Sequence, residues 1–120
     1  MSTFSSAVSL HPYFKVQPGH LPAVKALLPV FVAKTQGEAA NLSYGFTLNG
    51  DEVFCREAYT SAEGVLAHLA NVGPELDKML SHAALTRLEV HGPAAELAKL
   101  KEPLASLAPA WFTCECGVTR

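Results

Sequence analysis

The chain has 120 residues, of which 49% are hydrophobic and only 17% are charged, and its formal net charge is −2. A chain of this length suits one domain with its own core, but so apolar a composition predicts a further buried surface, for which an interface between two copies is the simplest candidate. The nine Lys and Arg residues are scattered and form no basic stripe, which argues against a nucleic-acid partner.

The N-terminal residues and the cysteines favour a cytoplasmic location. The longest apolar run, residues 26–33, is far shorter than the ~20 residues of a membrane span, and no secretory signal is visible. We take residues 1–7 as a flexible tail and the whole chain, 1–120, as one domain. Three cysteines argue against a disulfide framework. Cys114 and Cys116 share one face of a predicted strand and are interpreted as small buried hydrophobes, because no neighbouring His or Cys cluster completes a metal site.

The first half of the chain predicts a strand, a helix and a hairpin. Apolar residues alternate in the first segment, recur at helical spacing in the second, and alternate again on either side of Asn49-Gly50, a strong signal for a tight turn. The predicted elements are a strand over 8–16, a helix over 21–35, and strands over 42–48 and 52–59. Pro29 should kink the helix, because it removes one backbone hydrogen bond.

The second half predicts two helical pieces, a strand, a short helix and a last strand. Thr60 or Ser61 should cap the first helix, which carries His68 and breaks at Gly73-Pro74. The later elements are a helical piece over 75–80, a strand over 84–91, a helix within 94–107 broken at Pro103, and a strand over 111–118.

This order of elements contains the ferredoxin-like split βαβ unit, followed by one more helix and strand. We therefore predict an α+β fold: a ferredoxin-like, four-stranded antiparallel sheet with two principal helices on one face, extended by the C-terminal strand. By the two-residue period of a strand, Leu85 should face away from Leu88 and Val90.

His68 and Glu57 are the leading candidates for a functional pair. His68 lies on or beside the apolar stripe of its helix, and Glu57 lies on an otherwise apolar strand face. Buried imidazole and carboxylate groups need partners, so we expect the two to lie within hydrogen-bonding reach, directly or through one water. Two roles remain open: His68 accepts a proton near neutral pH while Glu57 orients it, or the two form a buried structural pair.

Tyr44 and Tyr59, on adjacent predicted strands, could form an aromatic wall with Phe46, which would suit a flat phenolic or quinol-like ring. Each tyrosine taken singly would equally suit a protein core. None of the five histidines has the spacing of a metal-ligand motif, so we expect no metal site.

The segment Glu38-Ala-Ala-Asn-Leu-Ser-Tyr44, followed by Glu57-Ala-Tyr59 and by a helix carrying His68, resembles the antibiotic biosynthesis monooxygenase family. The resemblance covers roughly residues 8–91, although the family's Pro-Gly after the first glutamate is replaced here. It implies a ferredoxin-like fold that pairs into a dimeric α+β barrel, with the two sheets facing each other. We expect the segment 111–118 to reach toward the partner.

The same resemblance implies a reaction without a cofactor. His68 would remove a proton from a small aromatic or quinol-like substrate, the resulting anion would react with oxygen, and Tyr44 or Asn71 would hold the oxygenated ring. Haem degradation is disfavoured, because Lys78 stands where the family's haem-ligand histidine is expected. Two alternatives remain: a non-catalytic module that binds a small apolar ligand, and a structural dimer whose pocket is filled by side chains.

Overall fold

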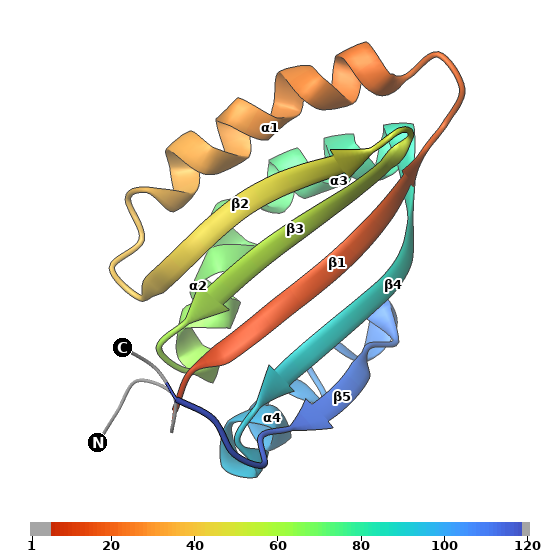
Figure 1. Cartoon of the computed structure of the whole chain (residues 1–120). Coiled ribbons are helices and arrows are strands. Elements are labelled where there is room, and N and C mark those ends of the chain that lie inside the picture. Colours follow the sequence, from red (N-terminus) through yellow and green to blue (C-terminus); the bar gives the residue numbers. More distant parts are fainter. Residues whose placement is uncertain (1–5, 119–120) are drawn as a thin grey trace.

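Five strands form one sheet in the order β2-β3-β1-β4-β5, with the helices on one of its faces (Figure 1). The structure is a computed structural model that describes residues 6–118, so most of the predicted tail at 1–7 lies outside the described residues. The strands are β1 (Val8–Val16), β2 (Asn41–Asn49), β3 (Glu52–Tyr59), β4 (Ala83–Gly92) and β5 (Ala110–Thr113). The helices are α1 (Leu21–Thr35), α2 (Ala62–Asn71), α3 (Gly73–His82) and α4 (Ala94–Leu100), followed by a 3₁₀ turn at Ala105–Leu107.

Strands β1 to β4 pair antiparallel, as the ferredoxin-like prediction requires. Local signals account for much of this half of the fold. Gly50 adopts a φ of 61° in the β2–β3 turn, where a side chain would be strained. The Ser61 hydroxyl accepts a hydrogen bond from the Gly64 N–H at 3.4 Å and caps α2. Both features confirm the prediction made from the residue types.

The core lies between the sheet and the helices in two clusters. One surrounds α2, α4 and the adjoining ends of β1 and β4, and includes Val8, Val65 and Leu100. The other lies under α1 and α3. It includes Val24 and Met79. The space where the two clusters meet, beneath α2 and α3, is where the candidate site described below is found.

A β-bulge in β4 makes the prediction for Leu85 wrong. Tyr13 pairs with Arg87 and Phe14 pairs with Leu85, so Thr86 is an extra residue in the ladder. The extra residue reverses the alternation of side chains, and Leu85 packs against the core on the same side as Leu88.

The C-terminal segment also differs from prediction. Strand β5 covers only Ala110–Thr113 and pairs parallel to β4, so the sheet is mixed. The N–H of Cys114 donates to the Gly92 carbonyl at 2.8 Å, and beyond it the ladder has no partner because β4 ends there. Cys116 is therefore exposed and Cys114 half-exposed, not buried on a strand face. Helix α4 ends at Leu100, before Pro103, and only a 3₁₀ turn follows.

Two further properties follow from the described residues. Within residues 6–118, no helix has the length and apolar character that crossing a bilayer requires. The same residues contain no group of three or more His, Cys, Asp or Glu side chains arranged to hold a metal ion.

Candidate functional site

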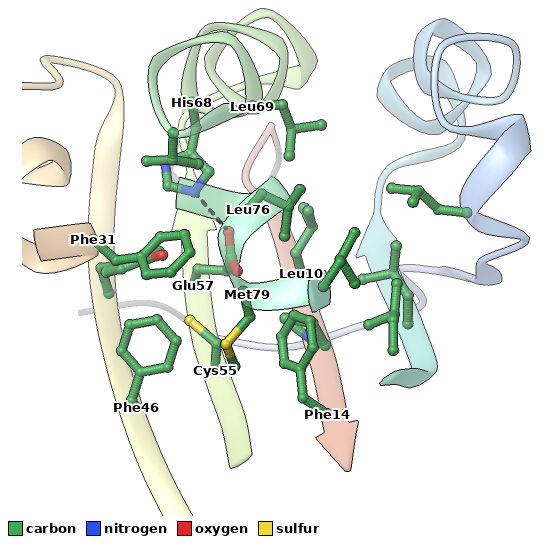
Figure 2. Close-up of a pocket in the computed structure, with 17 residues that line it drawn as sticks. Leu10, Phe14, Phe31, Phe46, Cys55, Glu57, His68, Leu69, Leu76 and Met79 are labelled. Carbon is green, nitrogen blue, oxygen red and sulfur yellow. Dashed lines mark ion pairs between the residues drawn. The ribbon is translucent and has the colours of Figure 1, made fainter. Parts of the chain in front are cut away.

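A largely apolar cavity of about 60 Å³ lies between the sheet and helices α1, α2 and α3 (Figure 2). Phe31 reaches it from α1, Leu76 and Met79 from α3, and Leu10 and Phe14 from β1. At one end, His68 points down from α2 toward Glu57 on β3, as Figure 2 shows. Among the described residues that form the wall there is no Lys or Arg. The polar end of the cavity therefore consists mainly of one imidazole and one carboxyl group.

Glu57 faces the helices because it alternates along β3 with Cys55 and Tyr59, which are also buried. Only 5% of Glu57 is exposed, and its Oε1 accepts a hydrogen bond from the Tyr59 hydroxyl at 2.7 Å. Burial raises the pKa of Glu57, while nearby His68 and the Tyr59 hydroxyl act in the opposite direction. The carboxyl group can thus hold a proton at a pH where an exposed glutamate has lost it.

His68 stands between two carboxyl groups. Its Nδ1 lies 2.9 Å from Oε2 of Glu38 and 3.1 Å from Oε1, and its Nε2 lies 3.5 Å from Oε1 of Glu57. The imidazole is only 3% exposed. The contact with Glu38 is a short hydrogen bond, whereas the contact with Glu57 lies at the outer limit for one.

Glu38 is the site residue that sequence reasoning missed. It lies between α1 and β2, and Asn71 donates to its Oε2 at 2.8 Å. The glutamate and the histidine are 30 positions apart, so no helical or strand period links them. The available signal was the segment from Glu38 to Tyr44, which carried the family resemblance but assigned this glutamate no role.

The aromatic residues of β2 lie on the cavity wall. Tyr44 and Phe46 line the cavity, and the ring of Tyr44 lies 5.1 Å from that of His68 and 5.4 Å from that of Phe46, between centroids. Burial raises the pKa of Tyr44, so its hydroxyl stays protonated. Beside them, burial also raises the pKa of Cys55, which keeps that group a thiol and a poor nucleophile.

Tyr59 and Asn71 lie behind the wall instead of on it. The Tyr59 ring packs 5.2 Å from the His68 ring and its hydroxyl is engaged by Glu57. The amide of Asn71 donates both to Glu38 and to the Lys34 carbonyl, at 3.0 Å for the latter. Tyr59 and Asn71 therefore hold the two carboxyl groups of the site, and neither residue lines the cavity.

The fold and site place the chain among ferredoxin-like α+β proteins with a cavity beneath the helices. No protein-family model and no curated protein matches the sequence. Among solved structures, MupZ from Pseudomonas fluorescens is 41% identical with a TM-score of 0.91, and the match covers 96% of this chain and 95% of MupZ. The chain belongs to the same family as MupZ.

More distant structures share the fold. Rv0793 from Mycobacterium tuberculosis is 24% identical, with a TM-score of 0.66 over 73% of this chain and 95% of that one. A putative antibiotic biosynthesis monooxygenase from Chloroflexus aurantiacus is 22% identical, with a TM-score of 0.62 over 74% of this chain and 94% of that one. These likenesses support the predicted ferredoxin-like fold of the monooxygenase type, and at this identity they concern the fold alone.

Proposed function

We propose that the chain is an enzyme that moves a proton on a small, largely apolar molecule, and that the reaction is a cofactor-independent oxygenation of an aromatic or quinol-like substrate. The observation that carries the proposal is the pair at the polar end of the cavity. His68 is anchored on one side by Glu38, and its other nitrogen is directed at Glu57 and the cavity. A base held by a third group, beside a space for a ligand, is the arrangement that proton transfer needs.

For a substrate that is a cyclic ketone or has a keto tautomer, the reaction would begin with removal of a proton by Nε2 of His68 from the activated CH₂ group of that ketone. The resulting carbanion adds dioxygen, and a proton returned from the site gives a hydroperoxide. Loss of water then leaves a carbonyl group, so the two hydrogens of the CH₂ group and one oxygen atom leave as water. Dioxygen is the oxidant. Burial raises the pKa of Glu57, so the carboxyl group that faces the developing anion is protonated more readily than an exposed one and repels the anion less.

The cavity limits the size and charge of the ligand. A volume of about 60 Å³ corresponds to roughly four to six water molecules, taking about 10–15 Å³ for each. A single ring therefore fits better than a polycycle, and it would displace flexible wall residues such as Met79. The described residues of the cavity wall include no Lys or Arg that could pair with an anion, so the substrate should enter neutral.

Oxygen consumption with a panel of quinols and cyclic ketones tests the proposal. We expect wild-type protein to consume oxygen with at least one single-ring member. His68→Ala should lower the rate by about 10²–10⁴-fold, the usual contribution of a general base, with the melting temperature within a few degrees of wild type. The matched control is His82→Ala, at the end of α3 and outside the cavity wall, which should retain the activity.

A binding module without chemistry is the second candidate. Within residues 6–118, no buried side-chain nitrogen or oxygen lacks a hydrogen-bond partner, which is also what a purely structural pair requires. Protein that consumes no oxygen with any member of the panel, yet binds a neutral ring compound by calorimetry, would favour this candidate. A strongly destabilised His68→Ala protein would point to a structural pair, because breaking a buried pair costs about 3–5 kcal/mol.

A further inference from the structure

We propose that Glu38 is the positioning residue that sets the tautomer of His68, so that Nδ1 keeps its proton and Nε2 faces Glu57 and the cavity as the proton acceptor. The inference rests on the proposed function and deepens it, since it assigns to Glu38 the orienting role that the residue pattern suggested for Glu57. It makes Glu38, His68 and Glu57 an ordered series in which only the last two meet the cavity.

The hydrogen-bond partners around Nδ1 favour one assignment of the proton. A neutral imidazole has one donor and one acceptor nitrogen, and an ionised carboxylate can only accept. Both oxygens of Glu38 lie within hydrogen-bonding distance of Nδ1, at 2.9 and 3.1 Å. Oε2 also accepts a hydrogen bond from the Asn71 amide at 2.8 Å, so the carboxyl group of Glu38 already acts as an acceptor toward α2. The shared proton therefore lies on Nδ1, and Nε2 of the neutral ring carries the lone pair.

Glu57 is less suited to the orienting role. Its Oε1 lies 3.5 Å from Nε2 and is already engaged by the Tyr59 hydroxyl at 2.7 Å. Burial also raises the pKa of Glu57, which makes it the carboxyl group that holds a proton to give. One carboxyl group thus faces each nitrogen of the imidazole, but their environments differ: Glu38 accepts a hydrogen bond from Asn71, whereas burial raises the pKa of Glu57.

The surroundings hold Glu38 in place. Asn71 lies one helical turn after His68 on α2, so a single helix carries both the imidazole and the amide that donates a hydrogen bond to Glu38. The same amide donates to the Lys34 carbonyl at the end of α1, and the Lys34 ammonium reaches Glu75 on α3 at 2.8 Å. On the strand side, Tyr44 packs against the His68 ring. The segment between α1 and β2 is therefore tied to α2 independently of any ligand.

Nitrogen-15 NMR of histidine-labelled protein tests the assignment without a substrate. Long-range couplings distinguish the Nδ1–H from the Nε2–H form, and comparison with a His68→Gln spectrum identifies the His68 signals among those of the five histidines. Spectra are recorded over a pH series up to the limit of folding. We expect His68 to be Nδ1–H in wild type, to remain so in Glu38→Gln, whose amide oxygen can accept, and to shift toward Nε2–H in Glu38→Ala. Glu63→Gln removes an exposed carboxylate on α2 that pairs with Lys99 and should leave the signals unchanged.

The results separate this inference from the proposed function. An Nε2–H ring in wild type, a ring that keeps both protons at every pH tested, or a tautomer unchanged by Glu38→Ala would overturn the role of Glu38. If Glu38→Ala fails to fold, the wild-type and Glu38→Gln spectra still test the role of Glu38, because an Nε2–H ring in either protein would contradict it. Where oxygen consumption is found, Glu38→Ala should lower kcat by about 10-fold or more with little change in KM, and Glu38→Gln should restore part of it. If the protein consumes no oxygen but the NMR spectra show that His68 is Nδ1–H, only the oxygenase proposal is refuted.

Discussion

At the scale of the residue, Glu57 couples the stability of the protein to pH. Its ordinary pKa of 4.5 is raised by burial in the folded chain. A carboxyl group whose pKa is higher in the folded than in the unfolded state binds its proton more tightly when the chain is folded. Its contribution to the free energy of unfolding is therefore fully present below the unfolded pKa, and it is lost as the pH rises through the folded pKa. Glu75 behaves in the opposite way, because the hydrogen bond from Lys34 lowers its pKa.

The variant Glu57→Gln isolates this contribution, because it keeps the size of the side chain and removes its titration. We expect wild type to lose stability relative to the variant as the pH rises from about 4.5 toward 8. The other carboxyl groups titrate in both proteins, so their effects cancel in this difference. Urea denaturation of the two proteins across this range measures the difference. A difference that stays constant or grows in favour of wild type would show that Glu57 is not protonated preferentially in the folded state.

The hydroxyl of Tyr59 makes a second prediction at this scale. Tyr59→Phe leaves a buried oxygen of Glu57 without its donor, which should cost about 1–3 kcal/mol in the free energy of unfolding. Tyr13→Phe, on the opposite face of the sheet, is the matched control and should change stability by no more than about 0.5 kcal/mol. Equal stability of the two variants in urea denaturation would contradict the structural importance of the Tyr59–Glu57 bond.

At the scale of the element, α2 packs closely against the segment before β2. A Cβ atom added at Gly64 would lie 2.8 Å from the Ala40 Cβ and 3.2 Å from the Tyr59 Cβ, whereas one added at Gly73 would meet nothing within 4 Å. Glycine at position 64 therefore lets α2 lie against the residues that carry Glu38, and the site depends on this contact.

Substitution by alanine at the two glycines tests the contact. Gly64→Ala should destabilise the protein by about 1–3 kcal/mol, as overpacking does, and should disturb the His68 signals by displacing Glu38. Gly73→Ala, in the first turn of α3, should be neutral or stabilising by up to about 1 kcal/mol, because it restricts the unfolded chain. Thermal unfolding of both variants provides the comparison, and a harmless Gly64→Ala would mean that α2 has room to move away.

At the scale of the whole molecule, the helices cover one face of the sheet and leave the other without a helix in residues 6–118 (Figure 1). This second face carries an aromatic patch, in which Phe54 lies 4.7 Å from Tyr13 and His91 stacks on Phe112 at 4.5 Å, between ring centroids. Phe112 is 41% exposed. An apolar patch on an open sheet is the surface that a second copy would bury, in keeping with the apolar composition.

We expect a homodimer in which the two sheets face each other through this aromatic patch. Sedimentation at micromolar concentration should give about twice the chain mass of 12.8 kDa. Phe54→Glu should give a folded monomer, because it places a charge in the interface. Val30→Glu, at an exposed apolar position on α1, should remain dimeric. A well-folded wild-type monomer would refute the dimer, and a dimeric Phe54→Glu would place the interface elsewhere.

The elements that the sequence determined by itself are those specified by neighbouring residues. Strand β1, helix α1 and the hairpin at Asn49-Gly50 lie where alternation, helical spacing and turn chemistry predict them, because each signal and its effect fall within a few positions of each other. Together with the predicted helix α2 and strand β4, these elements give the ferredoxin-like order. That His68 and Glu57 need buried partners also followed from polar residue types in apolar surroundings.

Only the tertiary structure decided which groups meet. The hydrogen bond between Glu38 and His68 joins positions 30 apart, and packing of α2 against the segment before β2 brings them together. The bulge at Thr86 arises from pairing with β1, and it moved Leu85 to the core side against the period of its own strand. The short β5 ends where β4 no longer offers backbone partners. In each case the deciding interaction is with a distant segment, and a pattern read along one element contains no information about that partner.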